Sequence, residues 1–292
     1  PLVQVPLGEG QGTSTLARLA GKETSLPLTP STTWQAGPSG QPAILLDGRA
    51  GELATSGDFE HDQPFAVSAW LRVPANDSAY AVVARMDEGN AHRGWDMWVQ
   101  GRRLGMHLIH AFPGDAIKVL ATDQLKADTW TLVAVTYDGS GKAEGVKIFY
   151  DGKEQKPKIE NNTFKKQSIR TEVPLAIGGR SKSATAHGVG LASLSIWGRG
   201  LSPGEVEGLP GDQRLMPGPP PRLAELISSP AAAAEMDLDW DIMSILAGQG
   251  ALIPLWVMLS TLLHSDQLSC LLPDPLNQVR TLFPPSIVLR FL

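Results

Sequence analysis

The sequence predicts an all-β fold: an antiparallel β-sandwich of the jelly-roll type, followed by a short irregular or helical C-terminal tail. Short runs between residues 41 and 200 alternate apolar and polar side chains with a period of two, and none carries the 3.6-residue apolar repeat of an amphipathic helix. The 292 residues include 30 Gly and 23 Pro, enough for many turns without reaching the composition of a disordered chain. Because the runs recur roughly every ten residues, they favour a sandwich over a βαβ fold.

Nine runs are predicted to be strands, and the residues between them favour turns. The predicted strands are Phe65–Arg72, Ala79–Arg85, Trp95–Gln100, Arg103–Ile109, Ile117–Ala121, Trp130–Tyr137, Val146–Tyr150, Pro174–Ile177 and Leu191–Trp197. Turns are expected at Asp138–Gly141, Asp151-Gly152, Asn161-Asn162 and Gly178-Gly179, since Gly, Asn and Asp tolerate the backbone conformations that turns need. The loop at Asp138–Gly141 should join two strands of one hairpin.

The composition changes near residue 210 and predicts three segments: a sandwich over 1–209, a Pro/Gly-rich linker over 210–222, and a tail over 223–292. The linker holds the run Pro217-Gly218-Pro219-Pro220-Pro221, which favours an extended chain, and no lysine follows it. Within the tail, the uncharged residues 242–263 would reach about 33 Å as a helix, against about 30 Å for a bilayer core. Three interpretations stay open, namely a membrane anchor, a helix packed on another domain, or an aberrant, out-of-frame end, and we favour the third.

The charge and the cysteine content exclude several classes of protein. A net charge of −5 without a basic stripe argues against a nucleic-acid partner. The single cysteine, Cys270, excludes an internal disulfide framework and a cysteine-based zinc site. The chain begins with Pro1 and has no leader-like segment, so we expect it to be a fragment of a longer protein.

Five pieces of the sequence, in their order and spacing, carry a resemblance to a known family. They are Ile44–Gly48, Phe65–Trp70, Trp130–Asp138, Val146–Gly152 and Leu194–Ser202. Together they resemble a laminin-G-like module of the concanavalin A-like lectin/glucanase superfamily, from about Val3 to Leu209. The resemblance implies a jelly-roll sandwich, with Trp70 and Trp130 in its core.

Three further pieces resemble the modules of this family that are set inside large multi-domain bacterial envelope proteins, some of which have cytochrome-c-like regions. The pieces are Ala84–Asp87, Arg93–Trp98 and Met106–His110. This resemblance implies an extracytoplasmic location, in the periplasm or at the cell surface, and other domains of the parent protein as partners. Membrane contact is expected only if residues 242–263 are an anchor.

We expect no catalytic residues. Enzymes of the superfamily place two carboxylates on one strand in a Glu-x-Asp-x-x-Glu pattern, because a glycosidase needs a nucleophile and an acid. The nearest match, Glu235–Trp240, has Trp240 in place of the second Glu and lies in the tail. No nucleophile elbow or phosphate-binding glycine loop is present in the sequence, and Gly178-Gly179-Arg180 is interpreted as a turn.

No cofactor is expected, and a structural calcium ion is disfavoured. The family often holds Ca²⁺ between an early Asp-Gly and an acidic pair on the last strand. Asp47 is present, but Ala192 and Ser193 stand where the acidic pair is expected, and Ca²⁺ needs six to eight oxygen ligands. His107 and His110 are three residues apart on a predicted strand, so they point to opposite faces and do not form a metal site.

The leading hypothesis is a non-catalytic recognition module for carbohydrate or another cell-envelope polymer. Sugars stack on exposed aromatic rings while neighbouring polar groups bind their hydroxyls. The candidate ligand-binding residues are Trp95, Trp98, Arg85, Asp87, Asp96 and His110. Alternation along the strand predicts that Trp95 and Trp98 point to opposite faces, one into the core and one outward.

The alternative is a structural spacer or a protein–protein interaction domain without a small ligand. An exposed aromatic pair on the concave sheet would favour carbohydrate binding. A concave sheet covered with Lys, Thr and Glu would favour the spacer.

Overall fold

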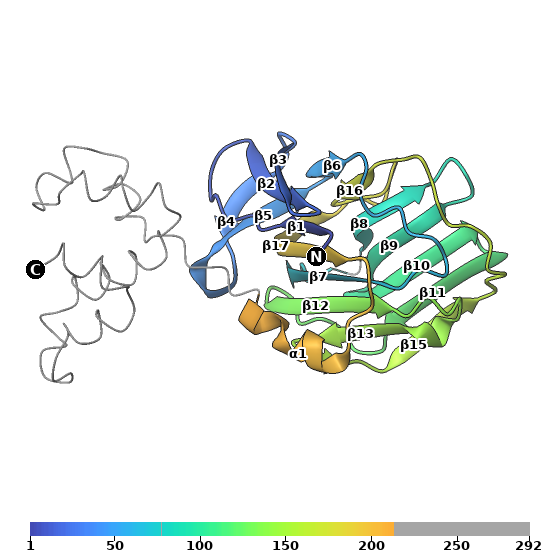
Figure 1. The fold of residues 1–292 in the computed structure, drawn as a ribbon. Coiled ribbons are helices and arrows are strands. Elements are labelled where there is room, and N and C mark those ends of the chain that lie inside the picture. Colours follow the sequence, from blue (N-terminus) through green and yellow to red (C-terminus); the bar gives the residue numbers. More distant parts are fainter. Residues whose placement is uncertain (77, 213–292) are drawn as a thin grey trace, which may run out of the picture. The chain divides into compact units, whose positions relative to one another are not determined.

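The fold is a β-sandwich of two antiparallel sheets, seen in a computed structural model that describes residues 1–76 and 78–212 (Figure 1). The predicted all-β, jelly-roll class is confirmed. The predicted linker from residue 213 onward, the tail over 223–292 and its apolar segment 242–263 lie outside the described residues. The division of the chain into these segments therefore stays a prediction.

The first sheet has ten strands, and its order is β14-β13-β12-β7-β17-β1-β2-β3, with β5 paired to β17 and β4 paired to β5. The strands are β1 (Val3–Val5), β2 (Ser14–Leu19), β3 (Lys22–Pro27), β4 (Thr33–Ala36), β5 (Pro42–Asp47), β7 (Phe65–Arg72), β12 (Trp130–Tyr137), β13 (Val146–Tyr150), β14 (Lys153–Glu154) and β17 (His187–Trp197).

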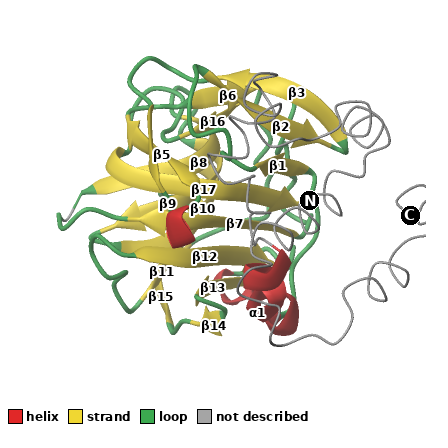
Figure 2. Cartoon of the chain, turned by 90° about the vertical axis from the view of Figure 1, so that its left-hand side faces the viewer, coloured by secondary structure: helices red, strands yellow, loops and turns green. Residues whose placement is uncertain are grey.

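The second sheet has seven strands in the order β15-β11-β10-β9-β8-β16-β6. They are β6 (Gly51–Leu53), β8 (Ala79–Asp87), β9 (Arg93–Gln100), β10 (Arg103–Ala111), β11 (Asp115–Ala121), β15 (Pro157–Asn162) and β16 (Leu175–Ile177). Two short 3₁₀ turns, η1 (Pro38–Gly40) and η2 (Ala143–Gly145), and the helix α1 (Pro203–Asp212) complete the described elements. Figure 2 shows the strands stacked in layers, with α1 outside them.

All nine predicted strands are present. A further strand, β15, forms where the sequence predicts a turn. The pair Asn161-Asn162, expected as a turn, forms the end of β15 and pairs with Lys118 and Ile117 of β11. The sequence of β15 is charged and largely exposed, so it lacks the alternation that marks a half-buried strand. Backbone pairing at the edge of the sheet holds it in place.

Two hairpins, β12–β13 and β13–β14, reverse at turns that the sequence predicts. β12 and β13 pair with Tyr137 opposite Val146, so the loop that begins at Asp138 joins them as predicted. The next reversal uses Asp151 and Gly152, with φ of 48° and 81°. A two-residue turn with both φ values positive matches the twist of the strands, and Asp-Gly adopts it at low cost.

The core lies between the two sheets and is centred on aromatic rings from both. Phe59 stacks on Phe65 at 4.4 Å, and the indole of Trp95 contacts both rings. Tyr137 of the ten-stranded sheet meets Phe65 edge-on at 5.8 Å. Trp95 is 1% exposed, and its Nε1 donates to the carbonyl of Gly57 at 2.7 Å, which satisfies its polar group inside the core.

Helix α1 covers part of the outer face of the ten-stranded sheet. Ser202 and Glu205 form a capping box: the Ser202 backbone N–H donates to the Glu205 carboxylate at 2.9 Å, and the Glu205 N–H donates to the Ser202 hydroxyl at 3.3 Å. Val206 and Leu209 of the helix join a second apolar cluster with residues of β7, β12 and β13. Both views place α1 beside β12 and β13 (Figures 1 and 2).

The expectation that Trp70 and Trp130 lie in the core is wrong. Both side chains are only partly buried, and they point to the outer face of the ten-stranded sheet. The reason is strand parity: Phe65 of β7 and Tyr137 of β12 point into the core, and Trp70 and Trp130 stand an odd number of residues away. Trp70 packs beside the helix cluster, and the guanidinium of Arg72 lies 5.8 Å from the Trp130 ring.

Because Trp95 lies in the core and Trp70 on an outer face, removing the two side chains should cost different amounts of stability. We expect Trp95→Ala to lower the free energy of unfolding by about 3–5 kcal/mol, because it empties a fully enclosed site. Trp70→Ala should cost about 1–2 kcal/mol, because less of its surface leaves water on folding. Urea denaturation of both variants checks this, and equal losses would contradict the assignment of faces.

Candidate functional site: the outer face of the seven-stranded sheet

The outer face of the seven-stranded sheet carries alternate residues of its central strands. On β9, Trp95 and Met97 lie in the core between the sheets, so Asp96, Trp98 and Gln100 point outward. The predicted opposition of Trp95 and Trp98 is confirmed. On β10, His107 stands opposite Asp96, and Arg103 stands opposite Gln100.

A buried charged cluster occupies this face. Asp96 is 0% exposed, His107 4% and Arg180 9%. Arg180 Nε donates to Asp96 Oδ2 at 2.8 Å, and Arg180 Nη2 lies 2.7 Å from the same oxygen. His107 Nδ1 lies 2.8 Å from Asp96 Oδ1, and the His107 backbone N–H donates to that oxygen at 3.2 Å. Every partner of the carboxylate is thus a donor or a cation.

These contacts determine the charge state of Asp96. Burial alone favours the neutral carboxyl, but the positive charge of Arg180 and the contacts from His107 outweigh it. They hold the pKa of Asp96 well below its usual range, so the carboxylate is ionised at neutral pH. Asp96 and Arg180 therefore form a buried ion pair that joins β9 to the segment after β16.

Trp98 lies beneath this ion pair. The Arg180 guanidinium is 4.3 Å from the centroid of the Trp98 ring, and the His107 ring meets it edge-on at 5.2 Å. The side chain also packs in an apolar cluster with Met86, Ile109 and other residues of this face. Trp98 is only 8% exposed, so it points outward but does not offer an open ring for stacking a sugar.

A chain of polar contacts leads from Trp98 along the sheet. Trp98 Nε1 donates to Gln100 Oε1 at 3.2 Å, and Lys118 Nζ donates to the same oxygen at 2.7 Å. Lys118 also pairs with Glu160 at 3.0 Å, and Glu160 pairs with Lys158 at 2.9 Å. Partial burial opposes the ionisation of Glu160, but hydrogen bonds from the two lysines lower its pKa.

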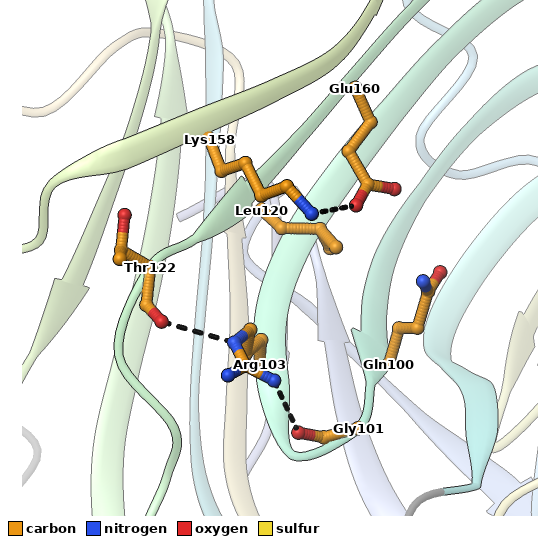
Figure 3. A pocket seen from close by; sticks show the side chains of 7 residues that line it. All are labelled: Gln100, Gly101, Arg103, Leu120, Thr122, Lys158 and Glu160. Atoms are coloured by element: carbon orange, nitrogen blue, oxygen red, sulfur yellow. Dashed lines mark hydrogen bonds and ion pairs between the residues drawn. The ribbon is translucent and has the colours of Figure 1, made fainter.

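An open pocket of about 360 Å³ lies at the end of this chain. Its lining residues are Gln100, Gly101, Arg103, Leu120, Thr122, Lys158 and Glu160. Figure 3 shows them around a common space, with Leu120 between the charged side chains of β15 and the Gln100–Arg103 turn. The pocket thus joins polar groups from three strands, and from Thr122 just after β11, to one apolar side chain.

Lys158 and Glu160 of β15 both line the pocket, and side chains two residues apart on a strand point to the same face. The pairing runs from Ile159 opposite Val119 directly to Asn161 opposite Lys118, so Glu160 is the extra residue. The register of β15 against β11 thus shifts by one residue at Glu160, as in a β-bulge. Glu160 contacts both Lys118 and Lys158 from this position.

The structure divides the six predicted ligand-binding residues among four places. Asp96 and Trp98 share the outer face. Trp95 lies in the core. Arg85 is buried nearby, donates to the carbonyls of Thr171, Ala54 and Ser56, and lies 3.5 Å from Asp58.

The remaining two residues lie at the strand ends away from the pocket. Asp87 ends the paired part of β8 opposite Arg93, and its carboxylate accepts from the backbone N–H of Gly89 at 2.9 Å. His110 contacts the carbonyl of Ser168 at 2.8 Å and Arg93 at 3.4 Å. The six residues do not form one site, and a ligand role for any of them stays a prediction.

Sequence reasoning missed Arg180 and most of the pocket. Arg180 follows a Gly-Gly turn, which gives no sign that its side chain reaches Asp96. Alternation along the predicted strands places Gln100 and Trp98 on one face, so Gln100 could have been found. Lys158 and Glu160 could not, because β15 carries no strand pattern.

Asp47, the residue considered for calcium, has a different partner. Its Oδ1 lies 2.6 Å from His187 Nδ1, and both side chains are well exposed. Within residues 1–76 and 78–212, no group of three or more His, Cys, Asp or Glu residues is placed to hold a metal ion. Over the same residues, no helix combines the length and the apolar character needed to span a membrane.

Removing Arg180 tests the buried ion pair. We expect Arg180→Met to cost about 3–5 kcal/mol of stability at pH 7, because it leaves the charge of Asp96 buried and without its main partner. The lowered pKa of wild-type Asp96 means that its stabilising contribution is present above about pH 4 and is lost as the pH falls further. In the variant, burial raises this pKa, so protonation relieves the penalty and the difference between the proteins shrinks towards pH 4.

Denaturant unfolding at pH 7 and pH 4 measures both effects. Arg199→Met is the matched control, since Arg199 pairs with Glu205 on the surface and should matter little at either pH. A cost for Arg180→Met that is the same at both pH values would contradict the role assigned to Asp96.

Comparison with solved structures finds the same fold in larger binding domains. The binding domain of Paraclostridial Mosquitocidal Protein 1 is 17% identical, with a TM-score of 0.55 over 71% of this chain and 51% of that one. The botulinum neurotoxin serotype G binding domain is 14% identical, with a TM-score of 0.52 over 73% and 51%. The serotype D ligand binding domain in complex with N-acetylneuraminic acid is 11% identical, with a TM-score of 0.52 and the same coverage.

At these identities the likeness concerns the fold, and the chain spans about half the length of each of these structures. No curated protein matches the sequence. A family model of laminin-G type, described as the concanavalin A-like lectin/glucanases superfamily, matches residues 47–207, which cover β6 to β17 and the start of α1. That match extends over more than half of the chain and agrees with the two-sheet fold, so the chain belongs to the concanavalin A-like lectin/glucanases superfamily.

Proposed function

We propose that the protein is a non-catalytic glycan-binding module whose site is the pocket on the outer face of the seven-stranded sheet. The observation that carries the proposal is the lining of this pocket. A guanidinium, an ammonium, an amide, a hydroxyl and a carboxylate surround the apolar side chain of Leu120 in about 360 Å³. Leu120 itself is 2% exposed, so the polar groups are the ones that a sugar's hydroxyls would meet, and directional groups of this kind recognise sugars.

The polar groups of the pocket are held in place by the protein itself. Gln100 Oε1 accepts from both Trp98 and Lys118, which fixes the direction of its amide. Glu160 is held between Lys118 and Lys158. A ligand therefore pays little entropy to order these side chains, which favours binding.

The charge states on this face support a non-catalytic role. A glycosidase needs a carboxylic acid whose pKa is raised so that it holds a proton near neutral pH. Lysine contacts lower the pKa of Glu160, and Arg180 with His107 lowers that of Asp96. Both groups are ionised and paired with cations, so neither is suited to donate a proton.

The structural neighbours are consistent with a binding module. One of them was solved with N-acetylneuraminic acid, and others are called binding or receptor binding domains. The ligand of this chain, a bacterial envelope protein as its parent and an extracytoplasmic location remain parts of the proposal.

A second candidate function, a spacer or protein-interaction domain, also has an observation in its favour. Lys118, Thr122 and Glu160 lie on the outer face of the seven-stranded sheet, and its tryptophan is covered by Arg180. The partly exposed pair Trp70 and Trp130 lies on the other sheet. The two outer faces must therefore be tested separately.

Binding of the full chain to a broad polysaccharide array tests the proposed function, with and without calcium. We expect saturable binding that Lys158→Ala weakens at least several-fold, because the variant removes one lining side chain and frees Glu160 from one of its lysines. Lys147→Ala is the matched control, since Lys147 is an exposed lysine of β13 in the other sheet, paired with Glu154.

Trp130→Ala distinguishes the two outer faces. Binding that is lost in Trp130→Ala and kept in Lys158→Ala would move the site to the ten-stranded sheet. A blank array from a folded chain would contradict glycan binding and support the spacer.

A further inference from the structure

We propose that the pocket selects acidic sugars and that Arg103 binds their carboxylate. This inference rests on the proposed glycan-binding function and names the ligand class of the same site. It comes from the arrangement of charge around the pocket, which differs in sign from the net charge of −5 of the whole chain.

Arg103 is a preorganised cation. Its Nε donates to the backbone carbonyl of Thr122 at 3.0 Å, and its Nη1 donates to the carbonyl of Gly101 at 3.4 Å (Figure 3). These contacts orient the planar guanidinium without neutralising it, and Nη2 is not engaged by any described residue. A planar guanidinium matches a carboxylate in geometry and charge.

Arg103 has no acidic partner among the described residues. Arg18, Arg49 and Arg199 pair with Glu23, Glu52 and Glu205, whereas Arg72, Arg93 and Arg102 share with Arg103 the lack of an acidic partner among these residues. Of these four, Arg103 is the one that lines the pocket. Glu160 lines the same pocket but is engaged by Lys118 at 3.0 Å and by Lys158 at 2.9 Å. An acidic ligand is the group that would complete the pairing of Arg103.

The balance of charge favours an anion in the pocket. Arg103 and Lys158 line the pocket with one carboxylate, Glu160, and Lys118, beside the pocket, adds a third positive charge through its contact with Glu160. The excess of positive charge should attract an acidic sugar over long range and should weaken with added salt.

The uncharged groups add donors for an acceptor-rich ligand. Gln100 uses its Oε1 to accept from Trp98 and Lys118, and its amide nitrogen has no partner among the described residues. That nitrogen can donate to a ring or carboxylate oxygen of a sugar.

The test compares acidic polysaccharides, such as polygalacturonate and alginate, with the same polymers after chemical reduction of their carboxylates to primary alcohols. The full chain should bind at least one acidic polymer at least tenfold more tightly than its reduced form, and raising the salt should weaken only the acidic interaction. Arg103→Gln should remove most of this preference. Arg102→Gln is the matched control, because Arg102 is the neighbouring residue, loses the same charge and does not line the pocket.

Two results would overturn the inference while leaving glycan binding intact. One is equal affinity for acidic and reduced polymers, or binding confined to neutral ones. The other is a preference for acidic polymers that Arg102→Gln and Arg103→Gln reduce alike, which would show general attraction by surface charge. Failure of the folded chain to bind any polymer would instead contradict the proposed function itself.

Discussion

The buried pair of Asp96 and Arg180 is the interaction on which the functional face depends. A carboxylate with no exposure is costly unless cations and donors surround it, and here Arg180 and His107 supply both. The pair holds the segment after β16 against the middle of β9. It also places a guanidinium over Trp98, which closes the apolar part of this face to water.

The fixed positions of the side chains around the pocket follow from that arrangement. Trp98, covered by Arg180, directs its indole N–H to Gln100, and Gln100 in turn accepts from Lys118. Lys118 helps to hold Glu160, which lies at the bulge of β15. A side chain buried for structural reasons thus positions groups that remain open to a ligand. This explains why a face without an exposed aromatic ring can still present an ordered set of hydrogen-bonding groups.

The two outer faces of the sandwich differ in chemistry. The ten-stranded sheet carries Trp70 and Trp130 and is partly covered by α1. The seven-stranded sheet instead carries charged side chains and the amide of Gln100 around a pocket. The covering helix depends on local sequence, because Ser202 and Glu205 cap it and Val206 and Leu209 attach it. An acidic sugar suits the charged face, since its recognition rests on charge and hydrogen bonds rather than on stacking.

The sequence alone determined the β-class of the protein, the nine central strands and the opposite directions of Trp95 and Trp98, because alternation and turn residues are local properties of the chain. The same parity, applied from Phe65 to Trp70, could have placed Trp70 on the outer face. Only the tertiary structure decided that Arg180 meets Asp96 across 84 residues and that Lys158 and Glu160 join the pocket. Such contacts depend on which strands become neighbours and where a bulge falls, and no local pattern encodes either when an edge strand is held by backbone pairing.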